Sequence, residues 1–240
     1  MLGQLLEFAI HTQPSAAALG FYEQLGFHSL SISDVRGGPY AAVSDGALTL
    51  GLTAEEIEGP VPIFVRPDLK PHLRGLRRLG VRFDFTELAD DEFNRAGFRD
   101  PNGRPVMLVE ARTSSPAPRA RTEVFACGEF LEWTVATHSL AESESFWAGL
   151  GLTRIAAGAS PHAWLRMAGR GLVVGFHESL RLAAGLSFRA PDLHARMEYL
   201  QAKNVRVIPG APVAPPGTNA ATLIAPERTP FYLVEEQTPT

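Results

Sequence analysis

Apolar and polar residues alternate near the start of the chain, and this pattern predicts a strand. Leu6, Phe8 and Ile10 are separated by Glu7 and Ala9, so the three apolar side chains share one face. From residue 15 to residue 25 the apolar positions instead recur every three or four residues, which predicts a helix with Ser15 as its N-cap. Three more strands are predicted at 27–33, 39–44 and 47–53.

The order strand, helix and three strands then follows three more times. The further helices are predicted at 68–79, 140–150 and 193–203. The further strands are predicted at 61–66, 81–88, 92–99, 105–110, 130–136, 153–157, 163–167, 172–177, 183–189, 205–208, 220–224 and 231–235. Four such βαβββ motifs predict the α+β fold class with mixed, curved sheets.

The sequence also repeats itself at a nearly constant offset. Phe21-Tyr22 and Leu25-Gly26-Phe27 recur 125 positions later as Phe146-Trp147 and Leu150-Gly151-Leu152. An offset that holds over the whole length indicates two copies of one module. We therefore predict a first module at 1–113, a second at 127–240, and a linker at 114–126 that is rich in Ser, Pro and Ala.

Composition narrows the classes of protein further. The 240 residues are 45% hydrophobic and carry a formal net charge of −4, which is enough apolar material for a core and argues against nucleic-acid binding. Cys127 is the one cysteine, so a disulfide within the chain and a cysteine-rich zinc site are excluded. No long apolar run and no basic leader is visible, so we expect no membrane partner and a cytoplasmic location.

The repeated segments resemble the vicinal oxygen chelate superfamily, the group of glyoxalases, bleomycin-resistance proteins and extradiol dioxygenases. Phe21-Tyr22, Leu25-Gly26-Phe27 and the turn Asp100-Pro101-Asn102-Gly103 before the last strand carry the resemblance, and the second copy departs from it with Ala225-Pro226-Glu227-Arg228. The resemblance implies that each pair of βαβββ units curls its sheet into a half-open cup that holds a ligand or a metal ion.

The resemblance also points to the positions where members with a metal place its ligands. These positions hold Glu7, Gly51, Val61 and Met107 in the first copy and Glu132, Gly175, Gly185 and Tyr232 in the second. A divalent ion normally needs three protein ligands, and each cup offers one carboxylate. We therefore expect no metal site and no cofactor. The alternative is a divalent ion (Zn, Fe, Mn or Ni) in an unusual place, such as one shared by Glu7 and Glu132 between facing cups.

Without a metal, the same positions predict a binding cup. Glycines in the wall let a ligand approach the backbone, and a carboxylate in an apolar cup has a raised pKa and suits general-base catalysis, the role predicted for Glu7 and Glu132. The predicted ligand-binding residues are His11, Gly51, Val61 and Met107 in the first cup and Thr134, Gly175, His177, Gly185, Ser187, Arg189 and Tyr232 in the second. The second cup is the more polar and the better candidate for specificity.

Other side chains with candidate chemistry receive structural predictions. Arg189 is expected either to bind a ligand carboxylate or to pair with Glu132. Trp133 and Trp147 are expected in the core, while Trp164 is left open. The remaining histidines are expected at the surface or as capping residues: His28, His72, His138, His162 and His194.

Three functional hypotheses follow. The first is metal-independent binding of a small, partly apolar molecule, as in the resistance-type members of the resembled group. The alternative is a metal-dependent lyase, isomerase or dioxygenase, and the third is a structural module that acts through protein contacts. We expect a small molecule as the partner and favour a monomer over a homodimer, because the duplication puts two modules in one chain.

Overall fold

A computed structural model describes residues 2–13, 15–30, 39–89, 94–111 and 125–235. The first module consists of β1 (Gln4–His11), α1 (Ala16–Gln24), β2 (His28–Leu30), β3 (Tyr40–Ser44), β4 (Thr49–Thr53), β5 (Val61–Arg66), α2 (Leu69–Arg78), β6 (Phe83–Glu87), β7 (Arg95–Arg99) and β8 (Pro105–Glu110). The second consists of β9 (Glu129–Ala136), α3 (Leu140–Gly149), β10 (Thr153–Gly158), β11 (Trp164–Gly169), β12 (Leu172–His177), β13 (Gly185–Arg189), α4 (Leu193–Ala202), β14 (Val207–Pro209), β15 (Ala220–Ile224) and β16 (Pro230–Val234).

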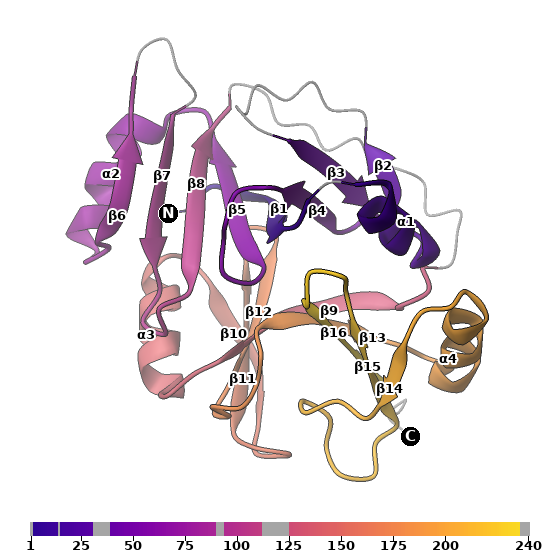
Figure 1. Cartoon of the computed structure of the whole chain (residues 1–240). Coiled ribbons are helices and arrows are strands. Elements are labelled where there is room, and N and C mark those ends of the chain that lie inside the picture. Colours follow the sequence, from indigo (N-terminus) through magenta and orange to yellow (C-terminus); the bar gives the residue numbers. More distant parts are fainter. Residues whose placement is uncertain (1, 14, 31–38, 90–93, 112–124, 236–240) are drawn as a thin grey trace.

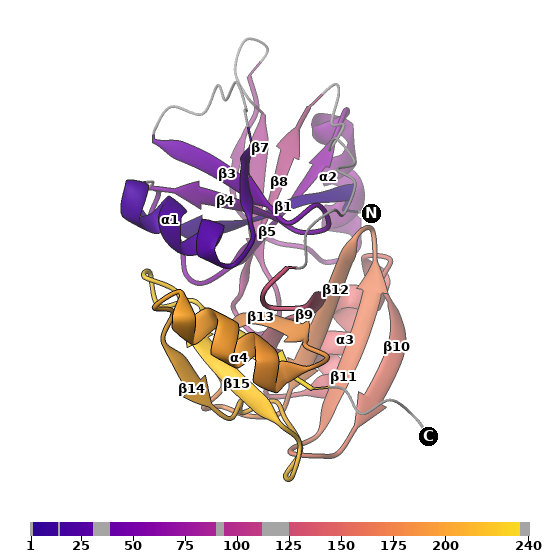
Figure 2. The same ribbon diagram turned by 90° about the vertical axis from the view of Figure 1, so that its right-hand side faces the viewer.

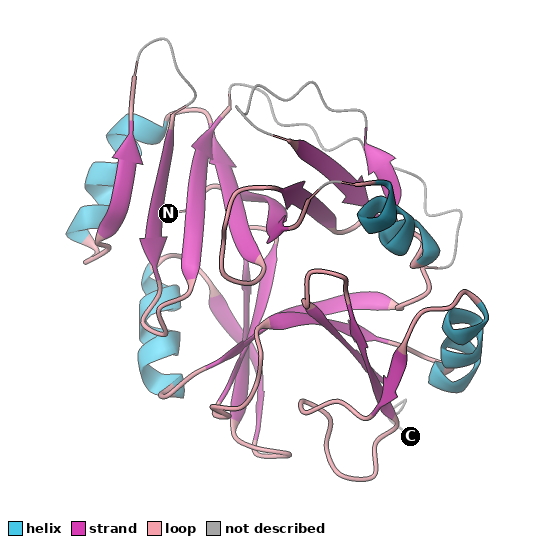
Figure 3. Cartoon of the chain, in the orientation of Figure 1, coloured by secondary structure: helices cyan, strands magenta, loops and turns pink. Residues whose placement is uncertain are grey.

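Each module forms one eight-stranded mixed sheet, and the two sheets have the same topology (Figure 1). The orders are β2-β3-β4-β1-β5-β8-β7-β6 and β10-β11-β12-β9-β13-β16-β15-β14. The first strand of each module joins its two βαβββ units: β1 pairs in parallel with β4 and antiparallel with β5, as β9 does with β12 and β13. The predicted α+β class with two tandem modules is confirmed, and Figure 3 shows the helices at the sides of the sheets.

Many predicted element ends agree with the structure. The strands β5, β8, β12 and β15 have the predicted bounds, and the Ser15 side chain accepts a hydrogen bond from the backbone N of Ala18, as an N-cap does. The strand predicted at 27–33 is described only over His28–Leu30, because 31–38 lie outside the described residues. The start of the strand predicted at 92–99 and most of the predicted linker, 114–124, also lie outside them.

Aromatic residues fill the contact between the modules, which stack on one another in Figure 2. The Phe8 ring lies 6.1 Å from that of Trp133 and 5.9 Å from that of Phe130, measured between centroids. Trp133 is 1% exposed and Trp147 is fully buried, which confirms that both belong to the core. Because neighbouring strand residues point to opposite faces, Glu7 and Glu132 point away from this contact, and one ion cannot be shared between them.

A hairpin turn of each module contacts a helix of the other module, in a nearly symmetric way. The turn between β7 and β8 meets α3, where the Asn102 amide donates a hydrogen bond to the Ser143 hydroxyl at 3.0 Å. The turn between β15 and β16 meets α1, where the Tyr22 hydroxyl donates to Glu227. The residues that depart from the superfamily pattern in the second copy therefore serve the contact between modules. None of the helices in the described part of the chain is long and apolar enough to cross a membrane.

Candidate functional site

A glutamate on the first strand of each module lies over a glycine on a neighbouring strand. A Cβ atom on Gly175 would lie 2.1 Å from Oε1 of Glu132, and one on Gly51 would lie 2.6 Å from Oε1 of Glu7. Both carboxylates are buried, with 1% and 2% of the residue exposed. The space over Gly51 and Gly175, which we expected a ligand to use, is therefore filled by a carboxylate of the same module.

Gly185 also makes room for the protein itself. A Cβ there would lie 2.4 Å from the Pro230 carbonyl oxygen and 3.1 Å from Cε2 of Tyr232. The Tyr232 hydroxyl donates a hydrogen bond to the Ala183 carbonyl oxygen at 2.9 Å, and burial raises the pKa of this phenol to about 12. Tyr232 is thus a neutral wall residue at physiological pH.

The strand pairing shows which side chains lie beside each glutamate. Ser187, not Gly185, lies opposite Glu132, and Tyr232 lies on the far side of Ser187. In the first module, Ile63 rather than Val61 takes the place opposite Glu7. The row of side chains across each sheet is therefore glutamate, Ser187 and Tyr232 in the second module, and glutamate, Ile63 and Met107 in the first.

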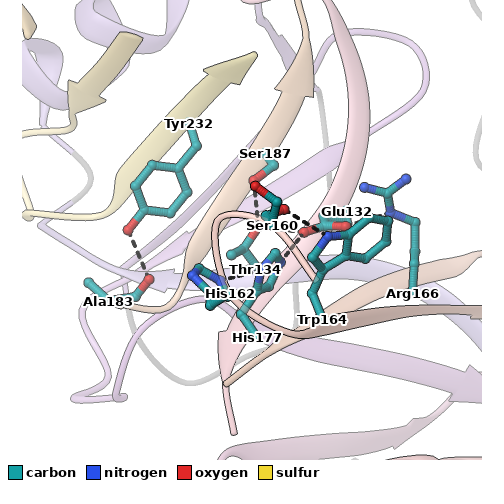
Figure 4. Close-up of polar contacts among 10 residues, drawn as sticks. All are labelled: Glu132, Thr134, Ser160, His162, Trp164, Arg166, His177, Ala183, Ser187 and Tyr232. Carbon is teal, nitrogen blue, oxygen red and sulfur yellow. Dashed lines mark hydrogen bonds and ion pairs between the residues drawn. The ribbon is translucent and has the colours of Figure 1, made fainter. Parts of the chain in front are cut away.

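Three polar side chains hold the carboxylate of Glu132 (Figure 4). The Arg166 Nε donates to Oε2 at 2.5 Å, His177 Nε2 lies 2.7 Å from Oε1, and the Thr134 hydroxyl donates to Oε1 at 3.2 Å. Thr134 is held in turn by the Ser187 hydroxyl at 2.5 Å. The charge of this buried carboxylate is therefore compensated by hydrogen bonds and by an ion pair.

The electrostatics of the second cup correct the expectation of a raised pKa. Burial by itself raises the pKa of Glu132, but the hydrogen bond and charge of His177 and the charge of Arg166 outweigh it. The net pKa lies below the usual value, so Glu132 is ionised at neutral pH.

A second histidine continues this network toward the surface. His162 Nε2 lies 2.9 Å from His177 Nδ1, and His177 is 3% exposed whereas His162 is half-buried. His162 lies at the rim, where it contacts His177 as well as solvent, a contact that the prediction of a surface or capping residue did not include. The Trp164 ring stacks on that of His177 and lies under the Arg166 guanidinium, 5.2 Å from its carbon. The indole N–H of Trp164 donates to the Ser160 carbonyl oxygen at 3.2 Å, which ties this group to the rim.

A cavity of about 310 Å³ lies in the second cup above this network. Its walls combine an aromatic ring, charged groups of both signs and apolar side chains, the usual make-up of a small-molecule site. The lining residues are Leu131, Glu132, Ser160, Trp164, Arg166, His177, Ser187, Arg189, Val213, Pro215, Thr218, Val234 and Glu235.

The first cup has a different filling. Ala9, Val61, Ile63, Val65 and Val109 form a buried apolar cluster, and Met107 packs against it. The Tyr40 hydroxyl donates to Oε2 of Glu7 at 2.5 Å. His11 has its Nδ1 at 2.8 Å from the Glu55 carbonyl oxygen in an exposed position. The structure therefore places His11, Gly51, Val61 and Met107 away from the cavity of the second cup.

Sequence reasoning missed Arg166, the ion-pair partner of Glu132. It assigned that role, as one of two alternatives, to Arg189, which lines the same cavity. A signal was present in the strand 163–167, where Leu165 and Met167 are buried core residues while Trp164 and Arg166 share the opposite face. The pairing of this strand with β12 places Trp164 beside His177 and Arg166 beside Gly175, next to Glu132, and the sequence does not show that pairing.

Comparisons with known proteins show similarity at the level of the fold. No family model matches the chain, and no curated protein matches its sequence. The 2,3-dioxygenase LapB from Pseudomonas sp. KL28 is 13% identical with a TM-score of 0.65, covering 100% of this chain and 96% of that one. The 2,2',3-trihydroxybiphenyl 1,2-dioxygenase from Sphingomonas wittichii RW1 is 14% identical with a TM-score of 0.62, covering 98% and 91%. A variant of homoprotocatechuate 2,3-dioxygenase from Brevibacterium fuscum is 14% identical with a TM-score of 0.67, covering 98% and 72%.

These comparisons correct the expectation that no cofactor is needed. The solved structures named above are dioxygenases, and dioxygen chemistry is carried by a cofactor, such as non-haem iron, rather than by amino-acid side chains. A non-haem iron oxygenase typically holds its metal with two histidines and one carboxylate on a shared face.

The residues of this chain do not form such a centre in the observed arrangement. Glu132, His177 and His162 have the appropriate donor types, but they lie in a line, and hydrogen bonds use both ring nitrogens of His177. Within the described residues, no group of three or more His, Cys, Asp or Glu side chains is placed to hold an ion. The chain thus shares its two-module fold with dioxygenases of known structure.

Proposed function

We propose that the protein is an enzyme of the kind found in this superfamily, and that it acts on a small, partly apolar molecule by proton transfer in the cup of the second module. The observation that supports it most is the ionised Glu132 at the wall of a cavity, paired with Arg166 and His177. Perturbed titratable groups that converge on a cavity are typical of catalytic sites. A lyase or an isomerase is the reaction class that these side chains support.

Glu132 is the general base in this proposal. Its carboxylate accepts a proton from the ligand, and the negative charge that remains on a ligand oxygen is stabilised by Arg166. The positive charge of Arg166 stays compensated during this transfer, because the ligand oxygen becomes negative as Glu132 becomes neutral. Trp164 provides a flat apolar surface for the rest of the molecule.

A binding protein that sequesters a small molecule is the second candidate. The closed network of Glu132, Arg166, His177 and Thr134 favours it, since every one of these groups already has a protein partner. Such a network forms a rigid wall without any reaction. For both candidates we propose that the chain works as a monomer, because each cup is built from strands of a single chain.

Matched variants of the two glutamates test the proposal. A panel of small phenols, aromatic carboxylates and 2-oxo acids is screened by thermal shift and for turnover, with and without added Fe²⁺, Mn²⁺ or Zn²⁺. We expect Glu132→Gln to abolish turnover and to weaken the thermal shift, and Glu7→Gln, the same change in the first cup, to leave both intact. Binding without turnover supports the second candidate. Equal losses in the two variants contradict the assignment to the second cup.

A further inference from the structure

His162, Ser160 and Trp164 form the outer wall of the polar network, and no step proposed so far uses His162. The chain of contacts runs from Glu132 Oε1 to His177 Nε2 at 2.7 Å and from His177 Nδ1 to His162 Nε2 at 2.9 Å. Along this line the residues change from buried Glu132 and His177 to half-buried His162. Three groups that each bind and release protons therefore connect the inside of the cup with its rim.

We propose that His162 is a proton-relay residue that exchanges protons between solvent and the Glu132–His177 pair. The inference rests on the proposed function, since a relay serves a site at which Glu132 gains and loses protons. His162 acts through His177 and does not line the cavity, so it is a positioning residue for the reaction rather than a catalytic one.

The relay is consistent with the hydrogen-bond roles along the chain. Ionised Glu132 accepts a hydrogen bond from Nε2 of His177, and in the neutral form of His177 the lone pair of Nδ1 then faces the N–H of His162. When solvent protonates Nδ1 of His162, the Nε2 proton of His162 passes to Nδ1 of His177. His162 is then neutral again, His177 is an imidazolium, and the Nε2 proton of His177 can pass to Glu132. One proton enters at the rim and one reaches the carboxylate, and the reverse sequence returns it.

The groups around the chain of contacts keep the proton from resting on His162. Burial and the charge of His177 lower the pKa of His162, so a proton does not remain there. Glu132 on β9 contacts His177 directly, and Arg166 on β11 pairs with the other oxygen of the same carboxylate. Arg189 on β13 and Glu235, which follows β16, are the other charged groups that line the same cavity.

Exchange of the ring protons of His177 with water tests the relay without any substrate. In protein labelled with ¹⁵N-histidine, NMR measures this exchange in the native chain, in His162→Gln and in His194→Gln, the latter at a solvent-exposed position on α4. A glutamine amide can keep the hydrogen bond to His177 but cannot relay a proton. Since a positioned acid–base group speeds proton transfer by about a hundredfold or more, we expect His162→Gln to slow the exchange at least about tenfold. His194→Gln leaves it unchanged.

Two further arms separate a relay from a merely structural contact. In His162→Ala, free imidazole is expected to restore the exchange, which a packing role does not predict. Faster or unchanged exchange in His162→Gln, or no rescue by imidazole, overturns the relay. If Zn²⁺ added alone binds at one equivalent and shifts the signals of His162 and His177 together, the pair is a metal site and the relay is also overturned. Slowed exchange combined with a failed ligand screen refutes the proposed function and leaves the relay intact.

Discussion

The two cups of this molecule share one framework and differ in the side chains that surround the same carboxylate. In both, a glutamate on the first strand lies over a glycine, Gly51 or Gly175, in the same sheet register. At five equivalent positions around the glutamate, the second cup has a side chain that is more polar or larger than the one in the first cup. Given as the residue of the first cup and then that of the second, the pairs are Ala9 and Thr134, Ala42 and Arg166, Thr53 and His177, Ile63 and Ser187, and Met107 and Tyr232.

The difference shows that a buried carboxylate alone does not mark an active site. Glu7 accepts a hydrogen bond from the neutral Tyr40 and borders an apolar cluster. Glu132 pairs with a cation and a histidine beside a cavity of about 310 Å³. The partners of the carboxylate, rather than the carboxylate itself, therefore distinguish the cup that we assign to function.

Removing one described partner of each carboxylate, Arg166 beside Glu132 and Tyr40 beside Glu7, should separate the two cups most strongly. We expect Arg166→Met to lower the free energy of unfolding by about 3 kcal/mol, because it leaves a buried charge short of its cation. Tyr40→Phe removes one hydrogen bond to a charged group and should cost about 1.5 kcal/mol. Urea unfolding followed by fluorescence measures both. An equal loss in the two variants would mean that the cups hold their carboxylates equally tightly.

A methyl group placed on the glycine under each carboxylate gives a smaller effect of the same kind. We expect Gly175→Ala to cost about 2 kcal/mol and Gly51→Ala about 1 kcal/mol, because the new Cβ must displace a carboxylate that three side chains hold in the second cup. Thermal unfolding of the two variants makes the comparison. If Gly51→Ala costs more than Gly175→Ala, Glu7 is the more rigidly held group.

Acid should weaken the second cup through Glu132, and this effect is expected to be the smallest. The pKa of Glu132 in the folded protein lies below its reference value of 4.5, so its stabilising contribution is present above that pH and is lost as the pH falls through the folded pKa. When the pH falls from about 5 to about 3, across that reference value, the free energy of unfolding should therefore decrease less for Glu132→Gln than for the native protein. Melting curves at each pH test this. Parallel curves for the native protein and Glu132→Gln would refute the lowered pKa.

The order of elements was predictable from the sequence because it depends on local patterns. The strand around Phe8 and Ile10, the N-cap Ser15 and the apolar phase of Trp133 are confirmed in the structure. The prediction that Leu6 shares a face with Phe8 and Ile10 is wrong, because the register shift between Leu5 and Glu7 turns Leu6 to the other face, where it packs beside Ala9. A constant offset between the copies predicted two modules with the same sheet order.

The side-chain network of the second cup was only partly predictable, because it depends on contacts between distant strands. The antiparallel pairing of β13 with β9 places Ser187 opposite Glu132, and a register irregularity follows directly after Ser187. Nothing in the sequence marks either feature. A glycine such as Gly175 is equally compatible with an approaching ligand and with a neighbouring carboxylate. Arg166 and His162 join Glu132 and His177 only through strand pairing and the loop that precedes β11.

A crystal structure of the protein with the strongest ligand from the thermal-shift screen tests the central claim most directly. The account predicts ligand density in the second cup, with a ligand oxygen at Arg166, the flat part of the ligand on Trp164, and Glu132 within hydrogen-bond distance. Anomalous scattering data from the same crystal locate any ion. Ligand density beside Glu7 in the first cup, or an ion bound jointly by Glu132, His162 and His177, would contradict the account.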